Sequence, residues 1–426
     1  MSRRCVWCRG LIGALLSGLA LAGAAQDTPA VVAQLNLPPV APTREVITAL
    51  PQVQAARAGM AWAQARNQQL VAGVHEWNLK WGTQRRRETA GTDYAESDLA
   101  LERSIRWGGK AQADRDLGEA GMAAGRSAYA DVWHEAVRGL VAAWYGWLRE
   151  RSAAAVLTQQ ASVAQTQVQV AARRVKAGDA PRMDQMMAQA EWERTRVAEQ
   201  QALAREQVQR EELRQRFPGL VLPAQVLPMG SPVPPLPGTA QDWQQRILDD
   251  NHEIELAEAE LRQARLRSER ARLDTRPDPL LGVRAARERG GQENIVGVYV
   301  SIPLPGAYRD GEQRAALALA DAAQQRLAET RRRVEAAAQR VVLQAGTTVA
   351  VAQRQAAVQQ AMADVAQLAG KAYALGEITL TEALQARRTA LEAALAAEAA
   401  RWDAQEALAR VLVDAHQLWA AEEGGH

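Results

Sequence analysis

Two long tracts rich in Ala, Gln and Arg dominate the chain, and each ends at a glycine, Gly178 in the first half and Gly376 in the second. Aligned on that glycine, both segments place an acidic residue directly after it and a second acid six positions after it. Glycine often ends a helix because it readily adopts the left-handed backbone conformation that closes the last turn. We therefore predict two helical hairpins that bend at these glycines and belong to a duplicated unit.

Between the helical tracts, apolar and polar residues alternate with a period of two, which is typical of strands with one apolar face. Each half holds two strand candidates around a polar turn, so each half predicts one β-hairpin. The positions on the predicted apolar face are Trp77, Leu79, Trp81, Leu99, Leu101, Ile105, Trp107, Val296, Val298, Val300 and Ile302. Arg103 falls on the same face of the first hairpin and interrupts its apolar pattern.

Each half of the chain thus has the order helix, β-hairpin, long helix, bend and helix. The first repeat covers residues 25–216, with a hairpin at 71–107, a long helix at 111–176 and a helix at 181–216. The second covers 240–421, with a hairpin at 280–302, a long helix at 312–375 and a helix at 381–419. A Pro-rich linker at 217–239 separates the repeats, and 422–426 is a short tail. The first helices are expected at 43–69 and 241–273, where Pro51 either kinks or delays the former.

The N-terminus has the pattern of a secretory signal peptide, predicted at residues 1–24. Three arginines precede an apolar run from Leu11 to Leu21, which is too short to span a bilayer, and small residues follow it. An uncleaved membrane anchor is the alternative. Cys5 and Cys8 precede the apolar run, so cleavage leaves a mature chain without a disulfide or a thiolate metal ligand.

Composition argues against ordinary globular domains, because Phe occurs once and Ala, Gln, Glu and Arg fill the long helical tracts. A formal net charge of +2 does not indicate nucleic-acid binding. The five histidines are scattered without the spacing of a metal site. We find no phosphate-binding loop and no nucleophile elbow, and we expect acids such as Glu191 and Glu193 to be solvated helix surface. The sequence therefore predicts no catalytic activity, no cofactor and no bound metal.

The predicted hairpins have an apolar face, a polar face and tryptophans near the strand ends, which is the pattern of membrane β-barrel strands. A bilayer offers no water to the unpaired edges of a sheet, so the sheet must close. Barrels begin at about eight strands, and this chain supplies four. Several copies must therefore share one barrel, where two copies would give a plugged barrel and three a conduit.

On these features the chain resembles the TolC-like outer membrane efflux family. The residues that carry the resemblance are Leu101–Lys110, Val298–Leu304 and the two glycine bends. The resemblance implies a mainly helical homotrimer, with a 12-stranded β-barrel in the outer membrane of a Gram-negative bacterium and an α-barrel tunnel across the periplasm. It further implies two partners, a periplasmic adaptor and a proton-driven inner-membrane efflux pump, and places the 217–239 linker in a belt around the tunnel.

Within that family, the chain resembles the cobalt–zinc–cadmium branch in its length, its lack of a lipid-anchor cysteine, and the segments Pro303–Pro305 and Arg309–Gly311. Heavy-metal cations are the cargo that this resemblance implies. Drug efflux and type I protein secretion stay open as alternatives. A soluble periplasmic adaptor is a further alternative, but that class has one helical hairpin between β-rich segments, and this chain has two hairpins.

The resemblance also implies roles beside the two bends, where the family closes the periplasmic end of its tunnel. Asp184 and Glu382 would form acidic rings there, because like charges in a narrow constriction attract cations. Tyr373 matches a latching tyrosine, while Ile378 stands where some members have a latching arginine. The alternative for both acids is an ordinary residue of a first helical turn, which the helix dipole favours.

The turns match the tips at which the family docks its adaptor. These residues are Ala177, Gly178, Asp179, Leu375, Gly376 and Glu377. A small residue beside glycine lets another backbone approach closely. Turn residues without any docking role have the same composition, so that alternative stays open.

Overall fold

The computed structural model describes residues 31–89, 91–223 and 231–421. The predicted signal peptide, the tail and part of the Pro-rich linker lie outside these residues. Contacts divide the described chain into two compact units. The first unit takes residues 31–50, 134–250 and 335–421, and the second takes 51–133 and 251–334. Each unit thus combines segments from both predicted repeats.

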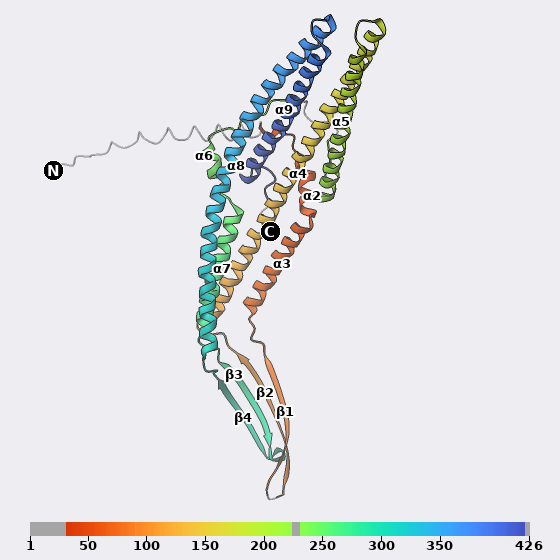
Figure 1. The fold of residues 1–426 in the computed structure, drawn as a ribbon. Helices are drawn as coiled ribbons and strands as arrows, with labels where there is room; N and C mark the ends of the chain where they lie inside the picture. Colours follow the sequence, from red (N-terminus) through yellow and green to blue (C-terminus); the bar gives the residue numbers. More distant parts are fainter. Residues whose placement is uncertain (1–30, 90, 224–230, 422–426) are drawn as a thin grey trace, which may run out of the picture. The chain divides into compact units, whose positions relative to one another are not determined.

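Helices account for most of the chain, and Figure 1 shows them with the four strands. The helices are α2 (Val40–Ala49), α3 (Pro51–Ala72), α4 (Lys110–Ala177), α5 (Arg182–Arg216), α6 (Ala240–Asp249), α7 (His252–Asp274), α8 (Ala307–Leu375) and α9 (Leu380–Asp414). The strands are β1 (Asn78–Arg87), β2 (Asp93–Ser104), β3 (Leu280–Glu288) and β4 (Glu293–Ser301), with a short helix η1 (Arg289–Gly291) between the last two.

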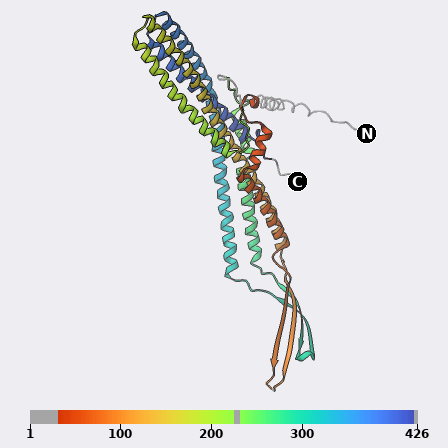
Figure 2. The ribbon, with the colours of Figure 1, turned by 90° about the vertical axis from the view of Figure 1, so that its right-hand side faces the viewer.

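The two predicted bends are present and have the same backbone geometry. Gly178 and Gly376 have φ of 81° and 80°. Beyond each glycine, a backbone N–H donates to a carbonyl five residues earlier, from Asp179 to Arg174 and from Glu377 to Ala372, both at 2.9 Å. This pattern closes a helix with a left-handed residue after its last turn. Both turns lie at the same end of the first unit (Figures 1 and 2).

Several helix boundaries differ from the prediction, and two of the differences follow from local hydrogen bonds. The predicted helix 241–273 is divided into α6 and α7, since the Asn251 side chain accepts a bond from the Ile254 N–H at 3.1 Å and starts a new helix. α9 ends at Asp414, where His416 takes a left-handed conformation with φ of 57°. α8 begins at Ala307, five residues before the predicted start at 312.

Pro51 separates the first two helices. Leu50 is extended, with φ of −62° and ψ of 136°, and Pro51 is the first residue of α3. Proline suits that position because its missing N–H would have no partner in the first helical turn.

The core of the first unit lies where α4 packs on α9. The rings of Trp144 and Trp147 have centroids 5.5 Å apart, and those of Tyr145 and Trp402 are 6.4 Å apart. All four side chains are fully buried. Tryptophan therefore builds the helical core as well as lying near the strand ends.

The four strands of the second unit form one antiparallel sheet in the order β1-β2-β3-β4 (Figure 1). The register places Leu101 between Leu79 and Val283, and Val283 opposite Val298. Because alternate residues of a strand share a face, the predicted apolar positions within β1, β2 and β4 fall on one side of the sheet, and Val283 of β3 lies on the same side. The second hairpin closely matches its prediction of 280–302.

The first hairpin is longer than its apolar pattern. β1 continues to Arg87 and β2 begins at Asp93, six residues before the predicted run that starts at Leu99. The added part is paired through charged side chains, since Asp93 contacts Arg85 at 3.3 Å and Arg87 at 2.9 Å. Apolar alternation marks only the half of this hairpin that adjoins the helices.

Candidate functional site

The residues beside the bends bring the two helical hairpins of the first unit into contact. Tyr373, in the last turn of α8, is 6% exposed, and its hydroxyl donates to the Asp184 carboxylate of α5 over 3.4 Å. Arg174 of α4 lies with Cζ 4.9 Å from the centre of the Tyr373 ring and donates to the Tyr373 carbonyl at 3.1 Å. Tyr373 and Asp184, two of the predicted gate residues, therefore contact each other, and Arg174 is a third member of this contact that the sequence did not indicate.

The two acids that follow the bends have different partners. Glu382 completes a capping box with Thr379, whose backbone N–H donates to the Glu382 carboxylate at 2.7 Å while its hydroxyl accepts from the Glu382 N–H. The corresponding cap of α5 is Pro181, which has no N–H to donate and makes no side-chain cap. Asp184 is thus left available for Tyr373, and Glu382 is held at the start of its own helix.

Burial and charge keep these groups in defined protonation states. Burial raises the pKa of Tyr373, and the negative charge of Asp184 raises it further, so the phenol stays a hydrogen-bond donor at neutral pH. The backbone N–H of Thr379 and then its hydroxyl lower the pKa of Glu382. That carboxylate is therefore ionised at neutral pH.

Apolar packing supports the contact between the hairpins. Tyr373 belongs to a buried cluster with Ala171, Ala188, Leu380, Ala383 and Leu384, drawn from all four helices of the two hairpins. Ile378 packs against this cluster and is partly buried. Ile378 is therefore an apolar packing residue in this chain.

The six predicted docking residues are all exposed at the turns. A Cβ atom added at Gly178 or Gly376 would meet nothing within 4 Å. The positive φ values therefore account for glycine at these positions, and the space next to each turn is open within this chain.

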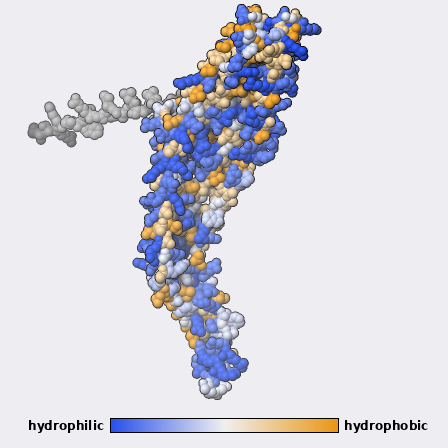
Figure 3. Space-filling model, viewed as in Figure 1, coloured by the Kyte–Doolittle hydropathy of each residue, from blue (hydrophilic) through white to orange (hydrophobic). Residues whose placement is uncertain are grey.

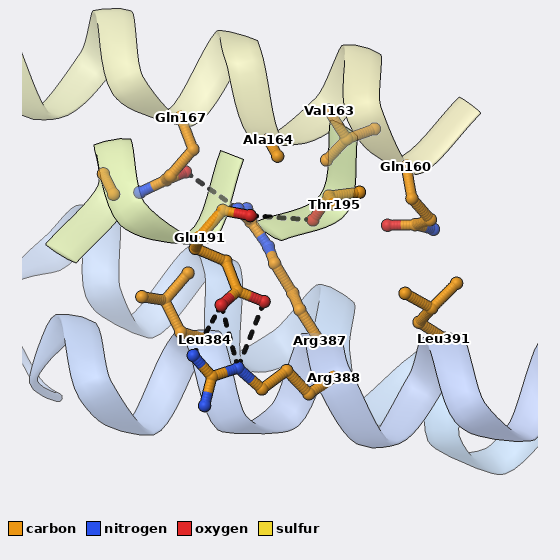
Figure 4. Close-up of a pocket in the computed structure, with 11 residues that line it drawn as sticks. Gln160, Val163, Ala164, Gln167, Glu191, Thr195, Leu384, Arg387, Arg388 and Leu391 are labelled. Atoms are coloured by element: carbon orange, nitrogen blue, oxygen red, sulfur yellow. Dashed lines mark hydrogen bonds and ion pairs between the residues drawn. The ribbon is translucent and has the colours of Figure 1, made fainter. Parts of the chain in front are cut away.

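A polar layer joins α9 to α4 and α5 further along the same helices (Figure 4). Arg388 donates to both carboxylate oxygens of Glu191, and Arg387 donates to Gln167 at 2.9 Å. Burial lowers the pKa of Arg387. The expectation that Glu191 is solvated surface was wrong, because its side chain is only 15% exposed. The buried residues Ala188 and Thr195, three before and four after it on the same helix face, were the signal that could have indicated this.

All eleven predicted apolar positions of the hairpins are exposed, from 38% for Leu101 to 85% for Val296. Trp77, Ile105, Trp107 and Ile302 flank the strands instead of lying within them. Arg103, the exception in the pattern, has Cζ 5.5 Å from the Trp77 ring centre and donates to the His75 carbonyl at 2.8 Å. The sheet thus presents a large apolar surface that nothing in the described chain covers.

The opposite face of the sheet is a network of charged and polar side chains. Glu102 is 3% exposed and contacts Lys80 at 2.6 Å, while the Tyr299 hydroxyl also donates to it. Glu96 accepts from Gln84 at 2.8 Å and contacts Arg86 at 3.1 Å. One face is therefore suited to an apolar environment and the other to water.

Neither a metal site nor a membrane-spanning helix is present in the described residues. No group of three or more His, Cys, Asp or Glu side chains in the described chain is arranged to hold a metal ion. Among the described helices, none combines the length and apolar character needed to cross a membrane.

No family model and no curated protein matches the sequence. Solved structures do match. The CmeC outer membrane channel of Campylobacter jejuni is 14% identical with a TM-score of 0.73, over 90% of this chain and 86% of that one. The outer membrane protein VceC of Vibrio cholerae is 15% identical, TM-score 0.70, over 88% and 94%. The open-state MtrE outer membrane channel of Neisseria gonorrhoeae is 16% identical, TM-score 0.64, over 88% of each chain. The chain has the fold of these channels.

Proposed function

We propose that this protein is the outer membrane channel of a tripartite efflux system, a passive duct that extends from the outer membrane of a Gram-negative bacterium into the periplasm. Three copies pool their strands in one 12-stranded β-barrel, and their helical hairpins form an α-barrel tunnel. The observation that carries the proposal is the four-stranded sheet, with an exposed apolar face, a charged opposite face, and outer strands β1 and β4 that each have one strand neighbour in the described chain.

The argument for several copies rests on the two edges of the sheet. In a bilayer, each unpaired N–H and C=O group of an edge strand costs several kcal/mol, so β1 and β4 need strand partners. Four strands are too few to close on themselves, since barrels begin at about eight. Three copies supply twelve strands, and the polar face then lines a water-filled lumen. The fold shared with solved outer membrane channels supports this assembly.

The distribution of charge along the sheet supports one orientation. On the apolar face, Trp81 is the last apolar position of β1, and Arg85 and Arg87 follow on the same face. In Figure 3 the far tip of the sheet is mostly hydrophilic. The lipid band therefore surrounds the half of the sheet next to the helices, the charged tip faces the cell exterior, and the helices stand in the periplasm.

Transport is passive in this account. A proton-driven inner-membrane pump supplies the energy, and a periplasmic adaptor docks at the exposed residues around Gly178 and Gly376. The contact between Tyr373 and Asp184 holds the two hairpins of each chain together in the closed state. Adaptor binding opens the tunnel because the adaptor binds the open state more tightly than the closed one. Asp184 and Glu382 form the acidic entrance to the tunnel.

Heavy-metal cations are the proposed cargo, on the resemblance of Pro303–Pro305 and Arg309–Gly311 to the cobalt–zinc–cadmium branch. A drug or a protein would leave through the same kind of duct, so the cargo needs its own test. Deleting the gene in its native host and measuring sensitivity to cobalt, zinc and cadmium separates these cargoes. Unchanged metal sensitivity with increased drug sensitivity would contradict the metal assignment and leave the duct in place.

The duct itself is tested by fractionation and conductance. We expect the protein in outer membranes, extracted by detergent as a stable trimer that forms conducting pores in planar bilayers. A water-soluble single chain recovered from the periplasm would contradict the proposal and favour an adaptor.

A further inference from the structure

The apolar face of the sheet holds a groove of about 690 Å³ at the end of the strands that joins the helices. Leu101, Val283 and Val298 form its strand wall, and Trp77 and Ile105 flank it. Ala72 at the end of α3 and Ala111 at the start of α4 place the groove at the junction of sheet and helices. All five wall and flank residues are exposed, so the groove opens to the surroundings of the apolar face.

Three basic side chains line this groove, and two of them contact a carboxylate. Arg106 contacts Asp114 at 2.9 Å and donates to carbonyls at the end of α3. His75 Nε2 lies 2.9 Å from the Asp278 carboxylate. Arg103 is exposed, and among the described residues no carboxylate pairs with it. If this face lies against a bilayer, a cation there is costly without an anion beside it, so Arg103 needs an anionic partner in that setting.

We propose that this groove binds an anionic phospholipid, with an acyl chain along Leu101, Val283 and Val298 and the headgroup phosphate on Arg103. The inference rests on the proposed outer membrane function. In that setting the helix-proximal end of the sheet lies at the periplasmic boundary of the bilayer, where phospholipid headgroups are found. Tryptophans gather at such boundaries, and Trp77 and Trp107 occupy this end of the sheet, both exposed.

The chemistry of Arg103 favours a lipid with net negative charge. A guanidinium matches the geometry of a phosphate and binds it through two parallel hydrogen bonds. The Arg103 Nε donor is already used by the His75 carbonyl, which orients the group beside the Trp77 ring. A zwitterionic headgroup brings its own ammonium group, which competes for the phosphate. The groove should therefore select phosphatidylglycerol over phosphatidylethanolamine.

Bound lipid is the direct readout. The full-length protein is reconstituted in bilayers containing equal amounts of phosphatidylglycerol and phosphatidylethanolamine, released in mild detergent, and analysed by native mass spectrometry. We expect the wild type to retain phosphatidylglycerol over phosphatidylethanolamine by about tenfold, which corresponds to roughly 1.4 kcal/mol. Arg103→Gln should bring that ratio close to one, and Arg103→Lys should keep part of the preference.

Arg287→Gln is the matched control. Arg287 is an exposed arginine on the same face of the sheet, opposite Ser97 and Asn294 and away from the groove. The Arg287→Gln variant should retain phosphatidylglycerol over phosphatidylethanolamine in the same ratio as the wild type. Val283→Trp fills the groove while leaving Arg103 in place, and it should reduce the retained amount of both lipids.

The outcomes separate this inference from the proposed function. If Arg103→Gln inserts into bilayers and keeps the wild-type lipid ratio, the lipid site is wrong and the duct stands. Equal loss of preference in Arg103→Gln and Arg287→Gln would also overturn the site, because the effect would then be general surface charge. If no variant and no wild-type protein enters a bilayer, both proposals fail.

Discussion

Pro181 and Thr379 occupy the same position after the two bends, yet they direct the acids that follow to different partners. Thr379 retains Glu382 in a capping box, whereas Pro181 cannot, and Asp184 reaches Tyr373 instead. Sequence alignment of the two bends made the acids look equivalent. Their difference depends on the backbone N–H that Pro181 lacks. The sequence shows that proline, but the contact of Asp184 with Tyr373 appears only in the folded chain.

We predict that Asp184→Ala and Tyr373→Phe each raise single-channel conductance in planar bilayers. The hydrogen bond between them contributes about 0.5–1.5 kcal/mol, so its loss shifts the closed-to-open equilibrium by roughly 2- to 13-fold. Because both changes remove the same contact, the double variant should conduct no better than the stronger single variant. Fully additive effects, or unchanged conductance in both single variants, would show that this contact does not hold the tunnel closed.

A second residue-scale prediction concerns the buried carboxylate of Asp414. Burial opposes its ionisation, but the hydrogen bond from His134 and the charges of Arg138 and Arg410 lower its pKa to about 2. A lowered pKa stabilises the fold at a pH above the unfolded value of 3.8, and this contribution is lost as the pH falls towards 2. It amounts to roughly 2 kcal/mol at neutral pH.

Asp414→Asn should therefore lower the thermal midpoint in detergent at pH 7, and should flatten the loss of stability between pH 4 and pH 2. Circular dichroism melts of both proteins across that range provide the measurement. If the thermal midpoints of the variant and the wild type fall in parallel between pH 4 and pH 2, then other carboxylates cause the loss of stability in acid.

At the scale of elements, one turn ties the sheet to two helices. Lys110 is 1% exposed and lies 2.8 Å from Asp278, 3.1 Å from Asp274 and 2.7 Å from the Arg276 carbonyl at the end of α7. Trp107, three residues earlier, donates from its indole N–H to the Pro277 carbonyl at 3.0 Å. Trp107 and Lys110, at the junction of β2 and α4, thus donate hydrogen bonds to the segment that joins α7 to β3.

We predict that Lys110→Met costs about 1–3 kcal/mol, because Asp278 and Asp274 lose a buried charged donor while His75 and Arg270 still pair with them. The yield of detergent-stable oligomer and its thermal midpoint should both fall. Lys371→Met is the control, since Lys371 is exposed on α8, and it should change stability by at most about 0.5 kcal/mol. Equal behaviour of the two variants would contradict a structural role for this turn.

The elements themselves were predictable to different degrees. The bends are predicted by a glycine at the end of each helical tract, and the second hairpin is predicted by the apolar alternation from Val296 to Ile302. The first hairpin was predicted only in part, because its outer half is held by Arg85, Arg87 and Asp93 and has no apolar pattern. The break at Asn251 and the end of α9 near His416 depend on single caps, which helical composition does not indicate.

At the scale of the whole molecule, the sequence predicted a sheet with too few strands to close into a barrel within one chain. Two amphipathic hairpins have too few strands to close, and the described chain joins them in one sheet with β1 and β4 at its edges. Pairing of β2 with β3, which joins the two predicted repeats, could not be derived from either hairpin alone. The assembly remains a proposal that follows from those edges.

Cysteine cross-linking of β1 to β4 between chains shows whether three copies share one barrel. The natural cysteines occur only at positions 5 and 8. Each test variant therefore carries two introduced cysteines, one on β1 and one on β4, which are the only cysteines in the described part of the chain. After oxidation in outer membranes, we predict that at least one register gives a ladder of covalent products that ends at three chains. A ladder that ends at two chains, or no cross-link in any register, would contradict a barrel shared by three copies.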